Sequence, residues 1–359
     1  MRMAASSIVS VLSLSAAFFS TACGGAPPKD ASTAPDLEAA AGGAPTVTPS
    51  GPTHPFNVDD MLSFERIEDP SASPDGKLIV FTVAVPDVDA NKSRRDLFVA
   101  AADGSNVKRL TSHPDADSAA RFAPDGKSIL FLSSRSGSSQ VWRIAVDGGE
   151  ATQVTNLPVD VGAVQPFPDG KRLLLALDVF PDAANLGETA KREKAKEASK
   201  QEVMAFDQLP VRHWDTWDDG KRTHLFVYDG ASAPRAARST PGDAKAEPID
   251  LLKGLPYDAP TKPFGDLSEV AISKDGSEVV FTSKMVGRED AWSTNMDLWR
   301  VPADGSAKPV SLTKDNPATD TQPVFSHDGT KLAYLAMSRP QYESDRLRVM
   351  VMDWKTKKV

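Results

Sequence analysis

The densest group of chemistry-bearing side chains in the sequence is one short run, Arg212-His213-Trp214-Asp215-Thr216-Trp217. A guanidinium and two indole rings on one loop could line a path for a substrate, because such groups bind ligands through ionic and stacking contacts. A structural interpretation is also open, in which the two tryptophans anchor the segment to the body of the protein and Arg212 pairs with Asp215. We carry forward five substrate-path candidates: Arg212, His213, Trp214, Asp215 and Trp217.

Nucleophilic catalysis finds no support in the sequence. A serine hydrolase of the α/β type carries a G-x-S-x-G turn between a strand and a helix. The nearest string, Gly230-Ala231-Ser232-Ala233-Pro234, ends in proline and follows an expected strand. No histidine has a convincing serine and carboxylate context; the five are His54, His113, His213, His224 and His327. We therefore expect no catalytic residue in this chain and no hydrolase activity from the chain alone.

Metal and cofactor chemistry is also poorly supported. Asp87-Val88-Asp89-Ala90-Asn91 resembles the start of a calcium loop, but Lys92 stands where glycine is needed and Phe98 where the last glutamate should be. We interpret this run as a polar loop between two strands. Because the sequence has no histidine pair at metal-ligand spacing and no glycine-rich phosphate loop, we expect no metal and no cofactor.

The N-terminus has the pattern of an export signal. In residues 1–23, Arg2 supplies a positive charge and residues 8–19 a short apolar stretch that is too short to span a membrane. The stretch ends in small residues before Cys23, which resembles the lipobox of bacterial lipoproteins although Ser20 stands where leucine is usual. We expect Cys23 to be acylated and to hold the exported protein on a bacterial membrane, facing the periplasm or the exterior. An ordinary cleaved signal is the alternative.

Composition limits what the rest of the chain can be. Of 359 residues, 40% are hydrophobic and 25% charged, which supports a folded core and excludes wholesale disorder. Residues 24–55, rich in Ala, Gly, Pro and Thr, are predicted to be a disordered tether. A net charge of −8 argues against nucleic acid as a partner, because duplex-binding surfaces need a basic excess. The single cysteine excludes a disulfide framework.

From residue 56 onward one theme recurs five times, an Asp-Gly step followed by consecutive apolar residues. The segments are SPDGKLIVF (73–81), APDGKSILF (123–131), FPDGKRLLL (167–175), SKDGSEVVF (273–281) and SHDGTKLAYL (326–335). Asp-Gly is typical of a tight hairpin, with glycine at positive φ and the aspartate bonded to nearby amides. A spacing of about 40–50 residues predicts a propeller or a solenoid.

The remaining strands of each repeat favour the propeller. Continuous apolar runs such as 129–132 indicate strands buried on both faces. A third strand is expected at 96–104, 140–149, 224–230 and 297–305, and a fourth at 108–111, 152–155 and 310–313. We predict an all-β fold, a β-propeller domain over residues 56–359 with about five four-stranded antiparallel blades, and we expect it to be incomplete. The blades are predicted near 70–111, 119–155, 163–252, 266–313 and 321–359.

Blade three is long because it carries an insertion, which we place at residues 180–222. Residues 187–205 are charged and helix-forming, with Glu188 and Arg192 at i,i+4 spacing. We interpret this stretch as a solvated helix; contact with another domain, or control of entry, is the alternative. The run that contains Arg212 follows it.

Two longer stretches carry a resemblance to a known family. Glu65-Arg66-Ile67 leads through Asp69-Pro70 into Ser73-Pro74-Asp75-Gly76-Lys77, and the run from Leu209 to Trp217 continues into Asp219-Gly220-Lys221-Arg222-Thr223-His224-Leu225-Phe226-Val227. Over roughly residues 56–359 the chain resembles the N-terminal propeller portion of the prolyl oligopeptidase family of serine peptidases, in its bacterial dipeptidyl-peptidase and acylaminoacyl-peptidase branch. TolB-like propellers share the Asp-Gly repeats, whereas the stretch around Arg212 is more specific.

The resemblance implies a division of roles between two domains. In that family the propeller restricts access to short peptides, and a C-terminal α/β-hydrolase domain carries the serine, aspartate and histidine. The sequence departs from the family because it stops at Val359, within blade five, so no family catalytic residue can be carried over. We therefore expect a fragment without the hydrolase domain. Its expected partners are short peptides, through the full-length enzyme, and a hydrolase domain in cis or in trans.

Three functions stay open at this point. The first is the substrate-gating propeller of a secreted, membrane-anchored serine exopeptidase, inactive alone. The second is a self-contained TolB-like binding propeller of the cell envelope, and the third is a peptidase whose catalytic half is a separate chain. The insertion in blade three favours the first, and the DNA downstream of the Val359 codon would separate the three.

Overall fold

The computed structural model describes residues 54–201, 203–230 and 247–359. The chain divides into two compact units, Met1–Ser63 and Phe64–Val359, and each is described by itself. In the first unit, helix α1 (Val58–Ser63) follows Asn57, whose Oδ1 accepts the N–H groups of Asp59 and Asp60 at 2.8 and 3.1 Å. The predicted signal, Cys23 and nearly all of the predicted tether lie outside the described residues. No helix within the described ranges is long and apolar enough to cross a membrane.

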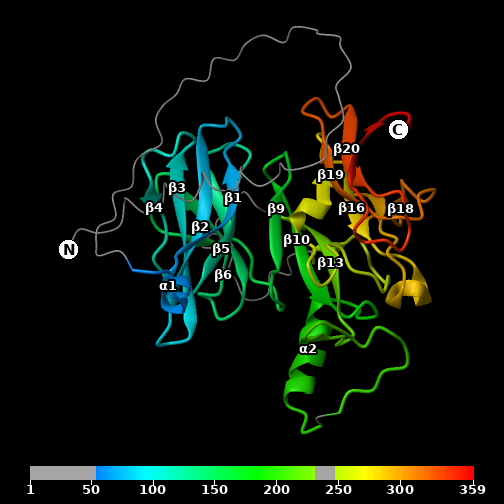
Figure 1. The fold of residues 1–359 in the computed structure, drawn as a ribbon, viewed down its shortest axis with the longest axis horizontal. Helices are drawn as coiled ribbons and strands as arrows, with labels where there is room; N and C mark the ends of the chain where they lie inside the picture. The colour runs from blue at the N-terminus through cyan, green and yellow to red at the C-terminus, as the bar shows by residue number, and fades with distance from the viewer. Residues whose placement is uncertain (1–53, 202, 231–246) are drawn as a thin grey trace. The chain divides into compact units, whose positions relative to one another are not determined.

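The second unit consists of antiparallel sheets whose strands follow one another in sequence (Figure 1). Blade one contains β1 (Arg66–Ala72), β2 (Leu78–Asp87), β3 (Lys92–Ala101) and β4 (Lys108–Arg109). Blade two contains β5 (Asp117–Phe122), β6 (Ser128–Ser133), β7 (Gln140–Ala145) and β8 (Thr152–Gln153). Blade three contains β9 (Ala163–Pro166), β10 (Arg172–Val179), β13 (Arg222–Asp229) and β14 (Ile249–Asp250).

Blade four repeats this order and blade five has three strands among the described residues. Blade four contains β15 (Val270–Ile272), β16 (Glu278–Ser283), β17 (Asp297–Pro302) and β18 (Val310–Ser311). Blade five contains β19 (Asp320–Phe325), β20 (Lys331–Ala336) and β21 (Arg348–Asp353). The other elements are α2 (Leu186–Glu197), the paired β11 (Arg212–His213) and β12 (Thr216–Trp217), and the 3-10 helices η2 (Leu267–Glu269) and η3 (Gly287–Ala291). The predicted all-β fold of four-stranded antiparallel blades, with a helical insertion in blade three, is confirmed.

The outermost strands are shorter than the sequence pattern predicts. Strand β4 pairs only through Lys108 and Arg109, whereas four residues were expected. Two residues later, the hydroxyl of Thr111 accepts the N–H of Leu97 at 3.0 Å, so a side chain takes the place of a ladder carbonyl. Because the same bond recurs in blades two and four, this threonine ends the outer strand wherever it occurs.

The Asp-Gly turns have the predicted conformation. In blade one, Gly76 has a φ of 70°, and the Oδ1 atom of Asp75 accepts from the N–H of Lys77 at 3.1 Å and the hydroxyl of Ser73 at 2.7 Å. The corresponding glycines of the other four repeats also have positive φ, which residues with a Cβ atom rarely adopt. The turn therefore depends on local chemistry that each repeat carries in its own sequence.

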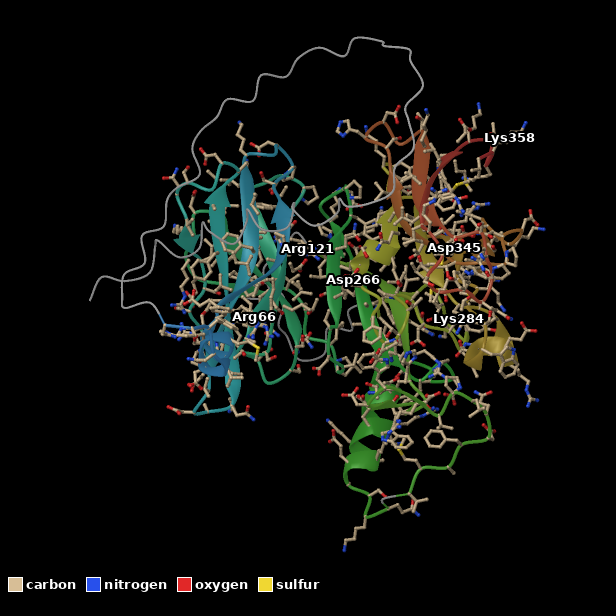
Figure 2. All side chains as sticks on the ribbon, in the orientation of Figure 1. Arg66, Arg121, Asp266, Lys284, Asp345 and Lys358 are labelled. Carbon is tan, nitrogen blue, oxygen red and sulfur yellow. The ribbon has the colours of Figure 1, made fainter. Side chains whose placement is uncertain are left out.

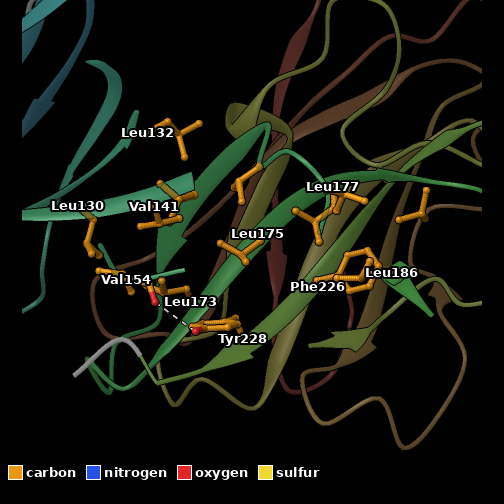
Figure 3. Close-up of a cluster of buried hydrophobic side chains, with 14 of the residues drawn as sticks. Leu130, Leu132, Val141, Val154, Leu173, Leu175, Leu177, Leu186, Phe226 and Tyr228 are labelled. Carbon is orange, nitrogen blue, oxygen red and sulfur yellow. Dashed lines mark hydrogen bonds between the residues drawn. The ribbon is translucent and has the colours of Figure 1, made fainter. Parts of the chain in front are cut away.

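The core lies between successive blades, as the continuous apolar runs predict. In β6, Ile129 and Phe131 pack in the core between blades one and two, while Leu130 and Leu132 pack in the core between blades two and three (Figure 3). The second of these cores also holds the hydroxyl of Tyr228, which donates to the Val154 carbonyl at 3.2 Å (Figure 3). Strand β6 is therefore buried on both faces.

Blade five differs because only one face of its sheet is covered. The face with Leu332, Tyr334 and Met352 packs against blade four. On the opposite face, Val349 of β21 is 71% exposed, whereas Val141, at the matching position of β7, is 0% exposed. The two valines match because Val349 pairs with Leu335 in the way that Val141 pairs with Leu132.

Candidate functional site

Helix α2 fixes the first part of the insertion, which lies between β10 and β13 (Figure 1). Asn185 caps the helix, because its Oδ1 atom accepts the N–H of Glu188 at 2.9 Å. Leu186 and Ala190 are buried in the core between blades two and three. The Nζ atom of Lys221, which directly precedes β13, lies 2.6 Å from the Glu193 carboxylate. The first turns of α2 are thus held in the core, and Lys221 binds the helix at Glu193 to the start of β13.

The prediction of a solvated helix over residues 187–205 is partly wrong, both in the length of the helix and in its exposure. The expected pair of Glu188 and Arg192 forms, with 2.5 Å between nitrogen and oxygen. The helix ends at Glu197 instead of continuing toward residue 205. Residues 194–201 are exposed, so no packing sustains the helix beyond this point, and short helices depend on packing. Helix α2 is solvent-exposed, as predicted, except in its first turns, which are buried.

Aromatic side chains gather on the second part of the insertion. We name Phe206, Arg212, His213, Trp214, Trp217 and Phe264 the insertion cluster. The short strands β11 and β12 pair Arg212 with Trp217, and the Arg212 guanidinium lies 5.1 Å from the centroid of the Trp217 ring. The Phe206 ring stacks on the same indole at 5.9 Å between centroids. Arg212 and Trp217 thus form a cation–π pair backed by a second ring.

Phe264 joins the cluster from outside the insertion, in the segment between β14 and η2. Its ring meets those of Trp214 and His213 edge to face, at 5.6 and 6.1 Å between centroids. Trp214 reaches it from a turn in which its own φ is 53°. Because aromatic edge-to-face pairs are favourable, these contacts hold the tip of the insertion against the connection between blades three and four.

The structure brings four of the five predicted site residues into this cluster and corrects one expected contact. Arg212 stacks on Trp217 and does not form the expected pair with Asp215, whose carboxylate accepts from the Thr216 hydroxyl at 3.4 Å. The β11–β12 hairpin explains this, because it places Arg212 opposite Trp217. Phe206 and Phe264 were not expected from the sequence, because neither belongs to a periodic pattern that could have indicated it.

The cluster is exposed to solvent although its ring contacts hold the insertion in place. Trp214 is 76% and Phe264 72% exposed. Exposed rings beside a guanidinium can stack on apolar or aromatic side chains and donate to carbonyl oxygens. Stacking and hydrogen-bond donation are interactions that bind a ligand, and these described side chains offer both.

A network of ion pairs supports the cluster at the start of β13. Arg222 binds both carboxylate oxygens of Asp218 at 2.9 Å, a bidentate geometry that fixes both side chains. Lys262, two residues before Phe264, lies 3.1 Å from Asp178 and 3.6 Å from Asp258. Thr223 adds two bonds, one from its N–H to Asp258 at 2.7 Å and one from its hydroxyl to Asp178 at 2.6 Å.

The two carboxylates that lie near Lys262 have opposite shifts of pKa. Burial raises the pKa of Asp258 above its ordinary value, and Lys262 only partly offsets this effect. For Asp178, burial also acts to raise the pKa, but Lys262 and the Thr223 hydroxyl together hold the pKa below its ordinary value. Lys262 thus favours the ionised form of both carboxylates.

His224 is the one described histidine whose environment resembles part of a catalytic triad, and its carboxylate partner was not expected from the sequence. The ring is fully buried, and Nδ1 lies 3.0 Å from Asp250 Oδ2. Nε2 lies 2.9 Å from the carbonyl oxygen of Leu255, where a catalytic histidine would meet a hydroxyl. The imidazole therefore joins β13 to the segment after β14 in a structural role.

Among the described residues no group of three or more His, Cys, Asp or Glu side chains is placed to hold a metal ion. The segment from Asp87 to Asn91 joins β2 to β3 as predicted, with Asp87 accepting the N–H of Ala90 at 3.0 Å. An open hollow of about 540 Å³ lies instead beside Trp292 and Tyr342, on the loops of blades four and five.

Comparisons with known proteins agree with this fold. The model of the TolB beta propeller domain matches residues 62–180. Dipeptidyl-peptidase 5 of Porphyromonas endodontalis is 32% identical over 294 residues, which cover 81% of this chain and 40% of the relative. Dipeptidyl-peptidase 5 of Porphyromonas gingivalis is 30% identical over 320 residues, covering 88% and 44%. The chain thus spans about two fifths of the length of these curated relatives.

A solved structure gives the same architecture. Uncomplexed acylaminoacyl peptidase from Pyrococcus horikoshii has a TM-score of 0.53 to this chain at 15% identity, covering 82% of this chain and 39% of that one. The fold is a β-propeller of four-stranded antiparallel blades, and residues 62–180 of it match the TolB beta propeller model. Its resemblance to the propeller portion of prolyl oligopeptidase-family peptidases, in the dipeptidyl-peptidase branch, is confirmed.

Proposed function

We propose that this chain is the substrate-gating propeller of a serine exopeptidase that removes dipeptides from short peptides. The observation that carries the proposal is the insertion cluster, an exposed aromatic and cationic surface on a chain similar to dipeptidyl-peptidase 5. Trp214 and Phe264 offer faces for apolar peptide side chains, and Arg212 offers donors for peptide carbonyls. A hydrolase domain, in cis or in trans, supplies the serine, histidine and aspartate in this proposal.

A chimera tests this role. Residues 64–359 replace the matching portion of dipeptidyl-peptidase 5 from Porphyromonas endodontalis, and hydrolysis of dipeptidyl chromogenic substrates is measured. We expect activity that Trp214→Ala lowers roughly two- to tenfold in kcat/KM, the range of one aromatic contact. Trp292→Ala removes a second exposed tryptophan that lies outside the cluster and serves as the matched control. Equal effects of the two substitutions would contradict a role for the cluster.

The isolated chain is expected to have no peptidase activity, because its sequence contains no G-x-S-x-G turn. The same chromogenic substrates test this, with a serine-directed phosphonate as the control. Hydrolysis that the phosphonate abolishes would overturn this part of the proposal and would assign the reaction to this chain.

Attachment to a membrane through Cys23 is part of the proposal. The motive is the sequence that surrounds this cysteine, and acyl chains would hold the protein on a bacterial membrane. Mass spectrometry of membrane-extracted protein should find a lipid-modified peptide that begins at Cys23, and Cys23→Ser should release the protein into the soluble fraction. An unmodified mature N-terminus at another residue would contradict the anchor.

A self-contained TolB-like binding propeller is the second candidate, because the family model matches residues 62–180. It predicts a folded chimera without peptidase activity, and a chain that captures an envelope partner without any hydrolase.

A further inference from the structure

His224 stands at a position that recurs at the third strand of each four-stranded blade. In blades one, two and four, this position directly precedes a residue whose N–H binds the hydroxyl of the threonine that ends the outer strand. In blade three Leu252 takes the place of that threonine, because the residue before it, Leu251, donates to the Leu225 carbonyl at 2.9 Å as its counterparts do. Blade three therefore ends its outer strand without that hydroxyl. The residues that match His224 are Asp96, Gln140 and Asp297.

Both ring nitrogens of His224 face oxygen acceptors. Nδ1 lies 3.1 and 3.0 Å from the two carboxylate oxygens of Asp250, and Nε2 lies 2.9 Å from the Leu255 carbonyl oxygen. The ring is fully buried, so water does not replace either partner. A neutral imidazole has a single N–H, which leaves one of these acceptors facing a lone pair. A ring with two N–H groups beside an ionised Asp250 satisfies every contact, and the charge-assisted bond between them offsets their burial.

Residues 251–266, which we name the blade connection, join β14 to η2 and carry Phe264. His224 holds the first turn of the blade connection through its bond to Leu255. Thr223, directly before His224, holds the next part, because its carbonyl accepts the N–H of the buried Ala259 at 2.8 Å. Two adjacent residues of β13 therefore fix the first half of the blade connection to blade three.

Phe264 lies in a turn at the second half of the blade connection. The N–H of Gly265 donates to the Thr261 carbonyl at 2.7 Å. The Glu269 carboxylate accepts the N–H and the hydroxyl of Thr261 at 2.8 and 2.9 Å. Asp266, labelled in Figure 2, follows the turn and caps η2. Because the turn is braced within itself, the place of the Phe264 ring depends on where β13 holds the segment that leads into the turn.

We propose that His224 is a positioning residue for the insertion cluster, because its two ring N–H groups hold the blade connection and so place Phe264 against Trp214. The inference deepens the proposed function and rests on it where it assigns peptide binding to the cluster. His224 is fully buried and acts on the peptide only through Phe264. If the bond to Leu255 is lost, its buried carbonyl is left without a donor, and the start of the blade connection shifts to find another.

The ¹⁹F NMR spectrum of the full chain, with 4-fluorophenylalanine in place of Phe264, tests this role. The label reports the edge-to-face contact with the Trp214 ring, so Trp214→Ala should shift its signal. His224→Leu removes both donors and should shift the signal in the same direction. His224→Gln should retain the wild-type signal, because the amide of Gln140 binds carbonyls from the matching position of blade two. A folded His224→Leu chain with the wild-type signal would overturn the proposal.

Gln140→Leu is the matched control for a general loss of stability. Gln140 is also fully buried, and its amide donates to the carbonyls of Leu157 and Val159 at 3.3 and 3.1 Å. Its substitution should lower the Tm as His224→Leu does and leave the ¹⁹F signal unchanged. Equal shifts of the signal in the two variants would mean that loosening anywhere in the propeller moves Phe264, which contradicts a specific role for His224.

A second variant keeps the test decisive if His224→Leu fails to fold. Asp250→Asn leaves an oxygen that accepts from Nδ1 but removes the charge that balances a ring with two N–H groups. The Leu255 carbonyl then loses its donor, so the ¹⁹F signal should shift in the direction of Trp214→Ala. A folded Asp250→Asn chain with the wild-type signal would show that the second N–H does not place Phe264, and the proposal would fall.

Kinetics of the chimera separate this inference from the proposed function. His224→Leu should lower kcat/KM for the dipeptidyl chromogenic substrate roughly two- to tenfold, as loss of one aromatic contact does, and should add nothing when Phe264→Ala is already present. Effects that add in full would overturn the inference and leave the gating role intact. A ¹⁹F shift in His224→Leu, with no change in kcat/KM from either His224→Leu or Trp214→Ala, would support the positioning of Phe264 and contradict the proposed function.

Discussion

Asp117 shows what a paired buried carboxylate contributes at the scale of a single residue. It is fully buried, and Arg135 is bound to both of its oxygens. We expect Asp117→Asn to lower the free energy of unfolding by about 3–5 kcal/mol, because it leaves the Arg135 guanidinium, whose side chain is only 14% exposed, without its carboxylate. Urea unfolding at pH 7.5 measures this. A loss below about 1 kcal/mol would mean that the pair behaves as a surface ion pair.

Asp320 should make the stability of the fold depend on pH, because its pKa is raised from 3.8 to about 6 in the folded chain. A raised pKa stabilises the fold while the group is protonated, and this contribution is lost as the pH rises through about 6. The stability of the wild type relative to Asp320→Asn should therefore fall by about 1–3 kcal/mol between about pH 4 and pH 7.5. Parallel pH profiles of the two proteins would contradict this.

At the same scale, the sequence predicted local chemistry well and contacts between distant segments poorly. The Asp-Gly turns followed from adjacent residues such as Asp75 and Gly76. The contact of Trp214 with Phe264 did not, because about fifty residues separate the two rings and no period connects them. The pairing of His224 with Asp250 across the blade was missed for the same reason.

At the scale of the element, burial of both faces explains why the central strands are continuously apolar. Val141 and Val349 test this, because they occupy matching positions and differ in exposure, at 0% and 71%. We expect Val141→Ala to lower the free energy of unfolding by about 1–3 kcal/mol and Val349→Ala to change it by less than about 0.5 kcal/mol. Denaturant melts measure both. Equal losses would mean that Val349 is covered in solution.

The presence of each central strand was predictable from the sequence. Successive side chains of such a strand point alternately into the two neighbouring cores, so the strand is a continuous apolar run, as in Leu173 to Leu177 of β10. Strand and helix ends were less predictable. Thr111 shortens β4 through a side-chain bond that no pattern of hydrophobicity reports, and α2 ends at Glu197 where packing stops, although helix-forming residues continue.

At the scale of the whole molecule, the uncovered face of blade five should govern how the chain behaves in solution. Val324, Val349 and Val351 are exposed on it, and contiguous apolar surface promotes association. We expect the purified chain to self-associate and to bind a hydrophobic dye, and Val349→Glu with Val351→Glu to reduce both effects. Light scattering decides this. A monodisperse wild-type monomer that binds no dye would show that the face is covered.

The central proposal is that this propeller is part of a peptidase and gates access to it. The most direct test is the substrate-length selectivity of the chimera with the hydrolase portion of dipeptidyl-peptidase 5. The rates to compare are those for a dipeptidyl chromogenic substrate and for the same N-terminal dipeptide on a folded protein. We predict rapid hydrolysis of the short substrate and exclusion of the protein, with Trp214→Ala altering the short-substrate kcat/KM and Trp292→Ala leaving it unchanged. A folded chimera that cleaves both substrates at similar rates, or whose rates ignore Trp214, would contradict the gating role.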